Sequence, residues 1–324
     1  MRRSIVGPYL AALISSFALA QSPPSTPLTL PPVEVGDAGP DGIRIDSDGV
    51  FANFFPAQMK GRRPAVLFLG GSEGGLQAGR TGMIRGLADS GFNVLYVCYF
   101  GCPGTPTKLV AVPLETFDRA IEFLRAQPTV NPDRIAVVGG SKGGEAALLV
   151  GTRDRTVKAV VAGMPSSVVW PGIARSGTLM QSSWTARGTG LAFLPYASGS
   201  FKTAGIFGLY NDALPALSQH PDAVISVERI RARILLVCGE ADTLWPSCQM
   251  TDQIRDRLKS KGRPAAIVLR YKDAGHAVLG IPVEKTSANY EALADFGGTA
   301  DGNAKARADS WPKIISFLKA TLSP

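Results

Sequence analysis

The stretch IAVVGGSKGGE, residues 135–145, decides the fold of this chain. Its apolar start at 135–138 predicts a buried strand, and the run 145–150 predicts a helix. Residues 139–143 match the pattern G-x-S-x-G, and a strand, a tight turn with serine and a helix form the setting of a nucleophile elbow. Glycines suit such a turn, because Cβ atoms beside Ser141 would collide with the strand or the helix. The alternative interpretation is a glycine-rich turn in which the serine is incidental.

The first 20 residues have the pattern of a secretory signal peptide. Arg2 and Arg3 precede an apolar run at 5–17, and the small residues at 18–20 form a cleavage site before Gln21. We therefore expect an exported protein, periplasmic or secreted after signal peptide removal. An uncleaved anchor is the alternative, although the run is too short to span a bilayer comfortably. Because no later segment is long and apolar enough to span, we expect no stable membrane anchor.

Composition limits the classes of partner. The chain has 324 residues, 45% of them hydrophobic, which is enough for a substantial core. The formal net charge is +8, but the basic residues are scattered, so nucleic acid binding has little support. A solvated basic surface explains this charge, and anionic substrates or surfaces are the alternative. We expect a small-molecule substrate and no cofactor or metal, since no cysteine or histidine grouping has metal-binding spacing. The oligomeric state is left open.

Four cysteines in an exported chain invite disulfides. Cys98 and Cys238 lie inside apolar runs, where buried free thiols are common. Cys102 and Cys248 follow them closely in sequence. A local bridge between Cys238 and Cys248 and a pair of free thiols both remain open.

Strands and helices alternate from residue 64 onward. The predicted strands are 65–69, 93–98, 135–138, 157–162, 234–238 and 266–271, and the predicted helices are 83–89, 114–127, 145–150, 251–261 and 310–322, with a turn at 128–134. Nearly continuous apolar strands predict an α/β fold with a mostly parallel sheet and helices on both faces. We expect residues 42–324 to form one domain that opens with a hairpin within 42–55. Residues 21–41, rich in proline, serine and threonine, predict a flexible leader.

Residues 163–226 interrupt the alternation. This insertion is much longer than an ordinary crossover, and its aromatic residues argue against disorder. We interpret it as a cap that helps shape an apolar pocket over the site; the alternative is that its aromatic side chains only build the core of the insertion. They are Trp170, Trp184, Phe193, Tyr196, Phe201, Phe207 and Tyr210.

A serine nucleophile needs an imidazole to take its proton and a carboxylate to orient that imidazole. His276 follows the last predicted strand and is the candidate base, whereas His220 lies inside the insertion. Asp242 follows the strand 234–238 and is the candidate acid, with Glu240 and Asp273 as rivals. The chain order serine, aspartate, histidine is the order expected in an α/β-hydrolase.

An oxyanion hole requires fixed backbone donors. One is expected at Lys142, the residue after the nucleophile, and the other in the loop at 70–75, from Ser72 or Gly71. A carboxylate aimed at the oxyanion would oppose catalysis, so we expect Glu73 to turn away or to pair with a cation such as Arg80. The loop is not a phosphate cradle, because no G-K-[ST] follows it.

Several longer motifs carry a resemblance to a known family. They are GGSEGG at 70–75, PLETFDRAIEFL at 113–124, NPDRIAVVGGSKGGEAALL at 131–149, SVERIRARILLVCGEADTLWPS at 226–247, DAGH at 273–276 and ADSWPKIISFL at 308–318. Over residues 60–322 the chain resembles the C-terminal catalytic domain of the acyl-CoA thioesterase / bile acid-CoA:amino acid N-acyltransferase family. The dienelactone-hydrolase-like group is a near relative whose elbow carries cysteine.

The resemblance implies an α/β-hydrolase fold and a triad of Ser141, Asp242 and His276. In this family serine at the elbow accompanies hydrolysis and cysteine accompanies transfer to an amino acid, so Ser141 favours hydrolysis. Residues 21–63 are too few for the N-terminal β-sandwich of the family's eukaryotic members. We thus expect a serine hydrolase for an ester or thioester of an apolar acyl group. An N-acyltransferase and a non-catalytic binding protein on the same fold are the alternatives.

Overall fold

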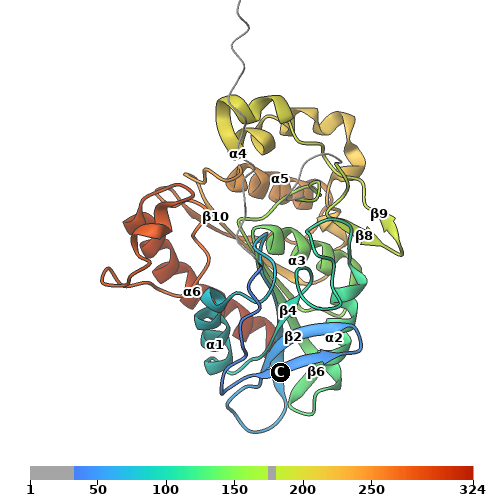
Figure 1. The fold of residues 1–324 in the computed structure, drawn as a ribbon, viewed down its shortest axis with the longest axis vertical. Helices are drawn as coiled ribbons and strands as arrows, with labels where there is room; N and C mark the ends of the chain where they lie inside the picture. Colours follow the sequence, from blue (N-terminus) through green and yellow to red (C-terminus); the bar gives the residue numbers. More distant parts are fainter. Residues whose placement is uncertain (1–32, 174–179, 324) are drawn as a thin grey trace, which may run out of the picture.

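The computed structural model describes residues 33–173 and 180–323. Its centre is an eight-stranded sheet in the order β1-β2-β4-β3-β6-β7-β10-β11 (Figure 1). The strands from β4 to β11 in this order run parallel, and β1 and β2 form the antiparallel hairpin predicted within 42–55. The bounds are Ile43–Ser47 for β1, Val50–Phe55 for β2, Arg63–Leu69 for β3, Asn93–Cys98 for β4, Val130–Gly140 for β6, Ala159–Gly163 for β7, Arg233–Gly239 for β10 and Ile267–Tyr271 for β11.

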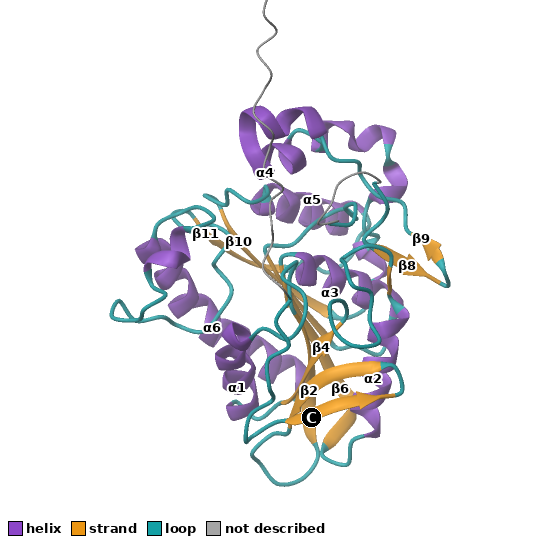
Figure 2. Cartoon of the chain, viewed as in Figure 1, coloured by secondary structure: helices purple, strands orange, loops and turns teal. Residues whose placement is uncertain are grey.

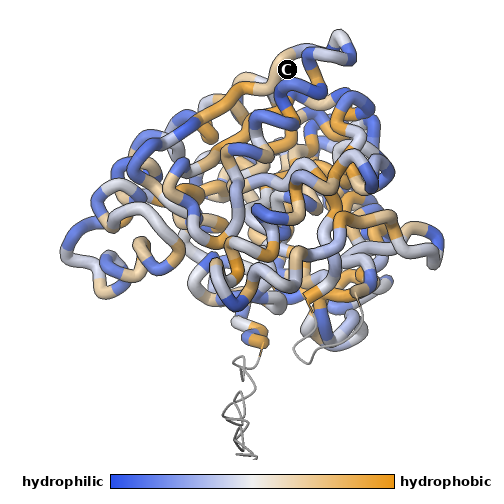
Figure 3. The backbone as a smooth tube through the Cα atoms, turned by 90° about the horizontal axis from the view of Figure 1, so that it is seen from above, coloured by the Kyte–Doolittle hydropathy of each residue, from blue (hydrophilic) through white to orange (hydrophobic). Residues whose placement is uncertain are grey.

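Helices cover both faces of this sheet (Figure 2). α2 (Glu115–Ala126), α3 (Lys142–Arg153) and α5 (Ser247–Ser260) bury apolar side chains in one core cluster, and α1 (Thr81–Asp89) and α6 (Ala300–Leu322) do so in a second. The central strands are buried on both faces, and Figure 3 shows their apolar stretches running through the interior. The predicted α/β architecture is therefore confirmed.

Several predicted boundaries differ from the structure, and two of them were wrong by five residues or more. Strand β6 begins at Val130 rather than at 135: Val130 pairs with Arg63, and after an irregularity the pairing resumes between Ile135 and Ala65. The sequence NPD at 131–133 suggested only a turn, but it forms this irregularity within the strand.

The last helix begins at Ala300 rather than at 310. Thr299 caps it, accepting a hydrogen bond from the N–H of Gly302 (2.9 Å). Pro312 lies inside the helix, where it removes one backbone donor without ending it.

The insertion forms several short elements. β8 (Trp184–Ala186) and β9 (Thr189–Gly190) make a small sheet with β5 (Val112–Pro113), and α4 (Phe201–Asn211) lies beyond them at the top of Figure 1. Trp170, Tyr196 and Tyr210 pack together, and Tyr210 contacts Trp245 outside the insertion (ring centroids 5.3 Å apart). Trp184 packs instead into the main core, against Tyr99 and Phe117. Some of these aromatic side chains thus build the core of the insertion, and others join it to the sheet.

Both pairs of neighbouring cysteines are bonded. Cys238 is joined to Cys248, and Cys98 to Cys102. The free-thiol interpretation of Cys98 and Cys238 was therefore wrong: in each case the partner cysteine is brought within bonding distance by the turn that follows the strand.

The predicted signal peptide and residues 21–32 of the predicted leader lie outside the described residues. The rest of that leader packs on the domain, where Val35 forms a bridge with Leu76. None of the helices within 33–173 and 180–323 combines the length and the apolar character needed to cross a membrane.

Candidate active site

Ser141 lies at the sharp turn between β6 and α3. Its backbone has φ 58° and ψ −125°, which a residue with a side chain adopts only where the surrounding structure imposes it. Its N–H donates to the carbonyl oxygen of Gly163 at the end of β7 (2.9 Å). The serine stands at the carboxyl end of a central strand and at the amino end of a helix, which is the arrangement of a nucleophile elbow.

Two glycines permit this turn. A Cβ at Gly139 would lie 2.1 Å from the carbonyl oxygen of Gly143, and a Cβ at Gly143 would lie 2.3 Å from that of Gly70. Both distances are too short for any side chain. Glycine at these positions lets the first turn of α3 rest directly on the ends of β6 and β3.

Asp242 and His276 meet where β10 and β11 end. Oδ2 of Asp242 lies 2.9 Å from Nδ1 of His276, and both side chains are buried. The carboxylate also accepts hydrogen bonds from Ser247 Oγ (2.7 Å) and from the N–H groups of Leu244 (2.9 Å) and Trp245 (3.3 Å). These contacts fix the carboxylate against the imidazole. A proton on Nδ1, donated to Asp242, leaves Nε2 as the basic nitrogen.

Nε2 of His276 is buried and has no hydrogen-bond partner among the described residues. The loop that carries the imidazole packs on the elbow, since Leu279 lies 3.0 Å from the position of a Cβ at Gly140. Within the described residues the structure brings Asp242 and His276 together, but no hydrogen bond joins Nε2 to the hydroxyl of Ser141. Catalytic hydrogen bonds of this kind often tighten only when substrate binds.

The rival residues do not contact the imidazole of His276. Glu240 is exposed and accepts a hydrogen bond from an arginine of β11 (3.3 Å). Asp273 is exposed on the loop after β11, and His220 lies between two short helical turns of the insertion. Among the described carboxylates, Asp242 is the one in contact with the imidazole of His276.

The loop after β3 borders Ser141. A Cβ at Gly71 would lie 3.4 Å from Cβ of Ser141. The carboxylate of Glu73 lies against this glycine, with Oε2 2.6 Å from the position of the same Cβ. The N–H groups of Ser72 and Lys142 have no acceptor within the described part of the chain, and that of Lys142 belongs to the first turn of a helix, where donors lack intrahelical partners.

Glu73 turns to Arg80, as expected from the sequence. Nη2 and Nε of Arg80 lie 2.9 and 3.1 Å from Oε1 of Glu73. Burial raises the pKa of Glu73, but Arg80 and the backbone donors outweigh burial and hold this pKa below its usual range. On the other side of the loop, the hydroxyl of Tyr99 lies 2.7 Å from the carbonyl oxygen of Gly70 and 2.9 Å from that of Gly71. The loop is thus held from two sides.

A buried ion pair lies directly behind the elbow. Nζ of Lys142 is 2.6 Å from Oε2 of Glu145, and both side chains are almost fully buried. Oε1 of Glu145 accepts hydrogen bonds from the indole of Trp184 (2.7 Å) and the N–H of Trp170 (3.2 Å). Burial lowers the pKa of Lys142 and raises that of Glu145, and their mutual attraction opposes both shifts. Sequence analysis missed this cluster; the i, i+3 spacing of the two charges was the available signal.

An open depression of about 620 Å³ lies beside the loop between β10 and α5. Its lining residues are Glu240, Ala241, Asp242, Thr243, Lys272, Asp273, Gly297, Gly298 and Thr299. Its three carboxylates and one lysine make it unsuited to an anion. No group of three or more His, Cys, Asp or Glu side chains within 33–173 and 180–323 is arranged to hold a metal ion.

Comparisons with known proteins agree with this architecture. A family model described as "BAAT / Acyl-CoA thioester hydrolase C terminal" matches residues 112–324. The chain is 27% identical to acyl-coenzyme A amino acid N-acyltransferase 2 of Rattus norvegicus, covering 81% of this chain and 61% of that protein. It is 25% identical to acyl-coenzyme A thioesterase 1 of Homo sapiens, covering 86% and 66%. The chain spans less than two-thirds of the length of these relatives.

Solved structures show the same fold. A puromycin-hydrolyzing peptidase of Mycobacterium tuberculosis is 19% identical with a TM-score of 0.57, over 87% of this chain and 40% of that chain. A dienelactone hydrolase-like promiscuous phosphotriesterase from metagenomic libraries is 17% identical with a TM-score of 0.52, over 84% and 92%. The fold of this chain is the α/β-hydrolase fold.

Proposed function

Because the chain belongs to the family of BAAT and acyl-CoA thioester hydrolase C-terminal domains, we propose that it hydrolyses an ester or thioester of an apolar acyl group. Ser141 is the nucleophile, His276 the general base and acid, and Asp242 the residue that orients the imidazole. The contact between Asp242 and His276 carries the proposal most directly, because it leaves a buried basic nitrogen in the loop that packs on the elbow.

The reaction proceeds through an acyl-enzyme. Nε2 of His276 takes the proton of Ser141 as Oγ attacks the carbonyl carbon. The tetrahedral intermediate then loses its thiol or alcohol, which leaves with that proton. Water, deprotonated by the same nitrogen, attacks the acyl-enzyme and releases the acid and Ser141. Throughout, Asp242 stabilises the transient imidazolium without itself being protonated.

The negative charge of each intermediate rests on backbone donors. The N–H groups of Lys142 and Ser72 are the proposed pair. Lys142 follows Ser141 directly, Ser72 lies in the loop that borders Ser141 at Gly71, and neither N–H has a protein acceptor among the described residues. Gly71 is the weaker candidate, since the carboxylate of Glu73 lies against it, 2.6 Å from the position of a Cβ there. Losing one such donor typically lowers the rate roughly 100- to 1000-fold.

Labelling with a fluorophosphonate tests the proposal. This probe reacts with an activated serine, so we expect it to label the wild-type protein at Ser141 and not the Ser141→Ala variant. Hydrolysis of p-nitrophenyl esters should be lost in the same variant. The matched control is His220→Ala, a substitution at the other histidine of the described chain, which should keep both properties. Folded wild-type protein that remains unlabelled would rule out the serine mechanism.

A second candidate is transfer of the acyl group to an amine. It is favoured by the N-acyltransferases among the relatives, whereas serine at the elbow favours water as acceptor. Adding amino acids during turnover separates the two: an acyltransferase forms the amide, and a hydrolase releases the free acid at an unchanged rate.

We infer further that the protein is exported, to the periplasm or the medium, with residues 163–226 forming a cap on the domain at 42–324. The pattern at residues 1–20 and the disulfides support export, because disulfides persist in oxidising compartments. An exported enzyme would meet esters and other thioesters rather than cytosolic acyl-CoA. N-terminal sequencing of the exported protein checks this inference, with Gln21 as the expected first residue.

A further inference from the structure

Arg307 lies on α6 and forms no ion pair with a carboxylate of the described residues. Its Nε donates to the carbonyl oxygen of Ala277 (2.6 Å), directly after His276. The plane of its guanidinium lies against Gly280, within about 3 Å of the position of a Cβ there. No acidic side chain of the described chain lies within salt-bridge distance, and no described residue accepts a hydrogen bond from its two terminal nitrogens. A half-buried guanidinium that is hydrogen-bonded to the loop of His276 and has no carboxylate partner among the described residues needs an explanation.

Arg80 is the neighbouring cation. It lies two residues before Gly82, where a Cβ would be 2.9 Å from Ile281, and Ile281 follows the glycine that Arg307 covers. Burial lowers the pKa of Arg307 to about 10, and the charge of Arg80 adds to this shift. Arg80 pairs with Glu73 through Nε and Nη2, which leaves its second terminal nitrogen unused among the described residues. Glu73 therefore pairs with Arg80, and no carboxylate of the described residues pairs with Arg307.

The two arginines are bonded to the two loops that lie next to Ser141, the loop of His276 and the loop after β3. Arg307 is bonded to the loop of His276. Arg80 is bonded to Glu73, whose carboxylate lies against Gly71, and Gly71 borders Ser141. Figure 1 shows α1 and α6 on the side of α3 opposite β8 and β9, so these two helices and the small strands of the insertion lie on different sides of α3.

We propose that Arg307 and Arg80 form a subsite for an anionic oxygen group of the substrate, either a carboxylate at the far end of the acyl chain or a phosphate of the leaving group. The proposal rests on the proposed hydrolysis at Ser141, which places the scissile carbonyl between the two loops that these arginines hold. Guanidinium groups bind carboxylate and phosphate through paired N–H donors. Such a ligand would supply the negative charge that the protein does not provide here.

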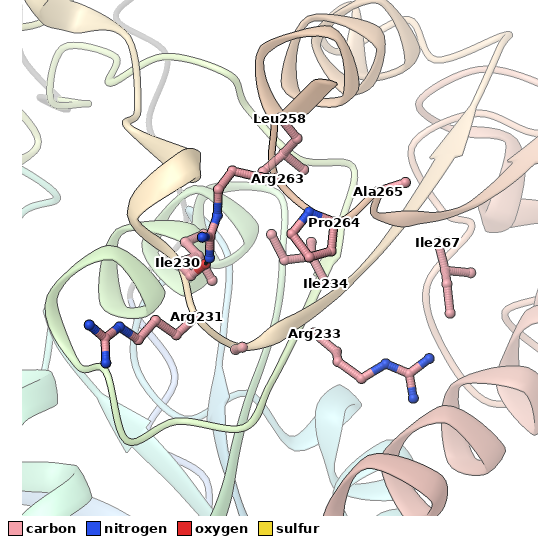
Figure 4. A pocket seen from close by; sticks show the side chains of 10 residues that line it. Ile230, Arg231, Arg233, Ile234, Leu258, Arg263, Pro264, Ala265 and Ile267 are labelled. Atoms are coloured by element: carbon pink, nitrogen blue, oxygen red, sulfur yellow. Dashed lines mark hydrogen bonds between the residues drawn. The ribbon is translucent and has the colours of Figure 1, made fainter. Parts of the chain in front are cut away.

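The far edge of the sheet offers a contrast. A pocket of about 110 Å³ there is lined by Arg231, Arg233 and Arg263 together with apolar side chains. Figure 4 shows these guanidinium groups pointing in different directions, and Arg263 donates to the carbonyl oxygen of Ile230 (3.2 Å). Since the charges do not converge, this pocket is not an anion site. Arg231, exposed and remote from Ser141, provides the control substitution.

Four thioesters test the proposal: hexanoyl and adipoyl groups, equal in length, each on coenzyme A and on N-acetylcysteamine. We expect Arg307→Gln to lower the adipoyl-to-hexanoyl ratio of kcat/KM by roughly tenfold or more on both thiols if the subsite binds the acyl carboxylate. If the subsite binds phosphate, Arg307→Gln instead lowers the ratio of kcat/KM for the coenzyme A thioesters to kcat/KM for the N-acetylcysteamine thioesters. Arg307→Lys should retain part of the preference, and Arg231→Gln all of it. An Arg307→Gln variant in which neither ratio changes overturns the proposal.

A binding measurement separates this proposal from the proposed function. If the wild-type protein hydrolyses none of the four thioesters, the proposed function fails, and thermal denaturation decides the subsite. Adipate or pyrophosphate should then raise the melting temperature of the wild type more than hexanoate at equal ionic strength, and should not do so for Arg307→Gln. Equal shifts in both proteins contradict the subsite. The melting temperature without ligand shows that each variant is folded.

Discussion

Asp242 is tied down by four donors, and only one of them is the imidazole. Asp242→Asn keeps the size of the side chain but removes its charge and can turn an N–H toward His276. Because the imidazole would then adopt the wrong tautomer, we expect kcat to fall about 10⁴-fold, as in serine proteases with the same change. Steady-state hydrolysis of a p-nitrophenyl ester measures this loss.

The two rival carboxylates are matched controls for that substitution. Glu240→Gln and Asp273→Asn each remove one exposed charge near the same strand ends. Both variants should keep kcat within about threefold of the wild type, because neither carboxylate touches the imidazole. A loss in Asp273→Asn comparable to that in Asp242→Asn would move the orienting role to Asp273.

Single residues differ in how far the sequence predicts them. Asp242 and His276 were predictable because each follows a strand whose apolar run is easy to recognise, and parallel strands bring such ends to one edge. Arg307 was not, because its position depends on how α6 packs against the loop after β11. The sequence likewise shows that Lys142 and Glu145 are three residues apart, but not that the insertion buries both.

At the scale of elements, the loop between β10 and α5 is closed by a covalent bond. Cys238 ends the apolar part of β10 and Cys248 lies in the first turn of α5, with Asp242 between them. A disulfide that closes so short a loop stabilises a protein by about 3 kcal/mol. We expect the double variant Cys238→Ala, Cys248→Ala to lose that much stability toward urea. Its kcat should also fall while the protein remains folded, because Ser247 and Trp245 would hold Asp242 less firmly.

Reductant provides the control for this prediction. It should lower the activity of the wild type toward that of the double variant, and any further loss in the double variant reports on the second disulfide, Cys98–Cys102. A double variant as active and as stable as the wild type would show that hydrogen bonds alone hold the acid loop.

Helices and strands could be predicted from the sequence where apolar residues recur at the constant spacing of one element type. α2 differs from its predicted range of 114–127 by one residue at each end, because Phe117, Ile121 and Leu124 mark one helical face. The first ten residues of α6 were missed because the helix buries only Asn303 and Ala306 there, which give no apolar period. A threonine cap and tertiary packing determine that part of the helix instead.

At the scale of the whole molecule, Glu145 joins three parts of the fold. It lies on α3 directly behind Ser141, pairs with Lys142 and accepts hydrogen bonds from two tryptophans of the insertion. The core of the sheet, the elbow and the insertion therefore share one buried carboxylate. The length and the aromatic content of the insertion were visible in the sequence. That Trp184 packs into the main core and donates a hydrogen bond to Glu145 is visible only in the structure.

Removing the charge of Glu145 alone should destabilise the protein more than removing the charges of both Glu145 and Lys142. Glu145→Gln keeps an acceptor for Trp184 but leaves Lys142 charged and buried, which typically costs about 3–5 kcal/mol. Adding Lys142→Met removes that charge, so the double variant should recover most of the lost stability in urea unfolding. Arg153→Gln is the control, because it breaks a partly exposed ion pair on the same helix and should cost less than about 1 kcal/mol. If the double variant is as unstable as Glu145→Gln, the uncompensated charge is not the cause, and the hydrogen bonds to the insertion must account for the loss.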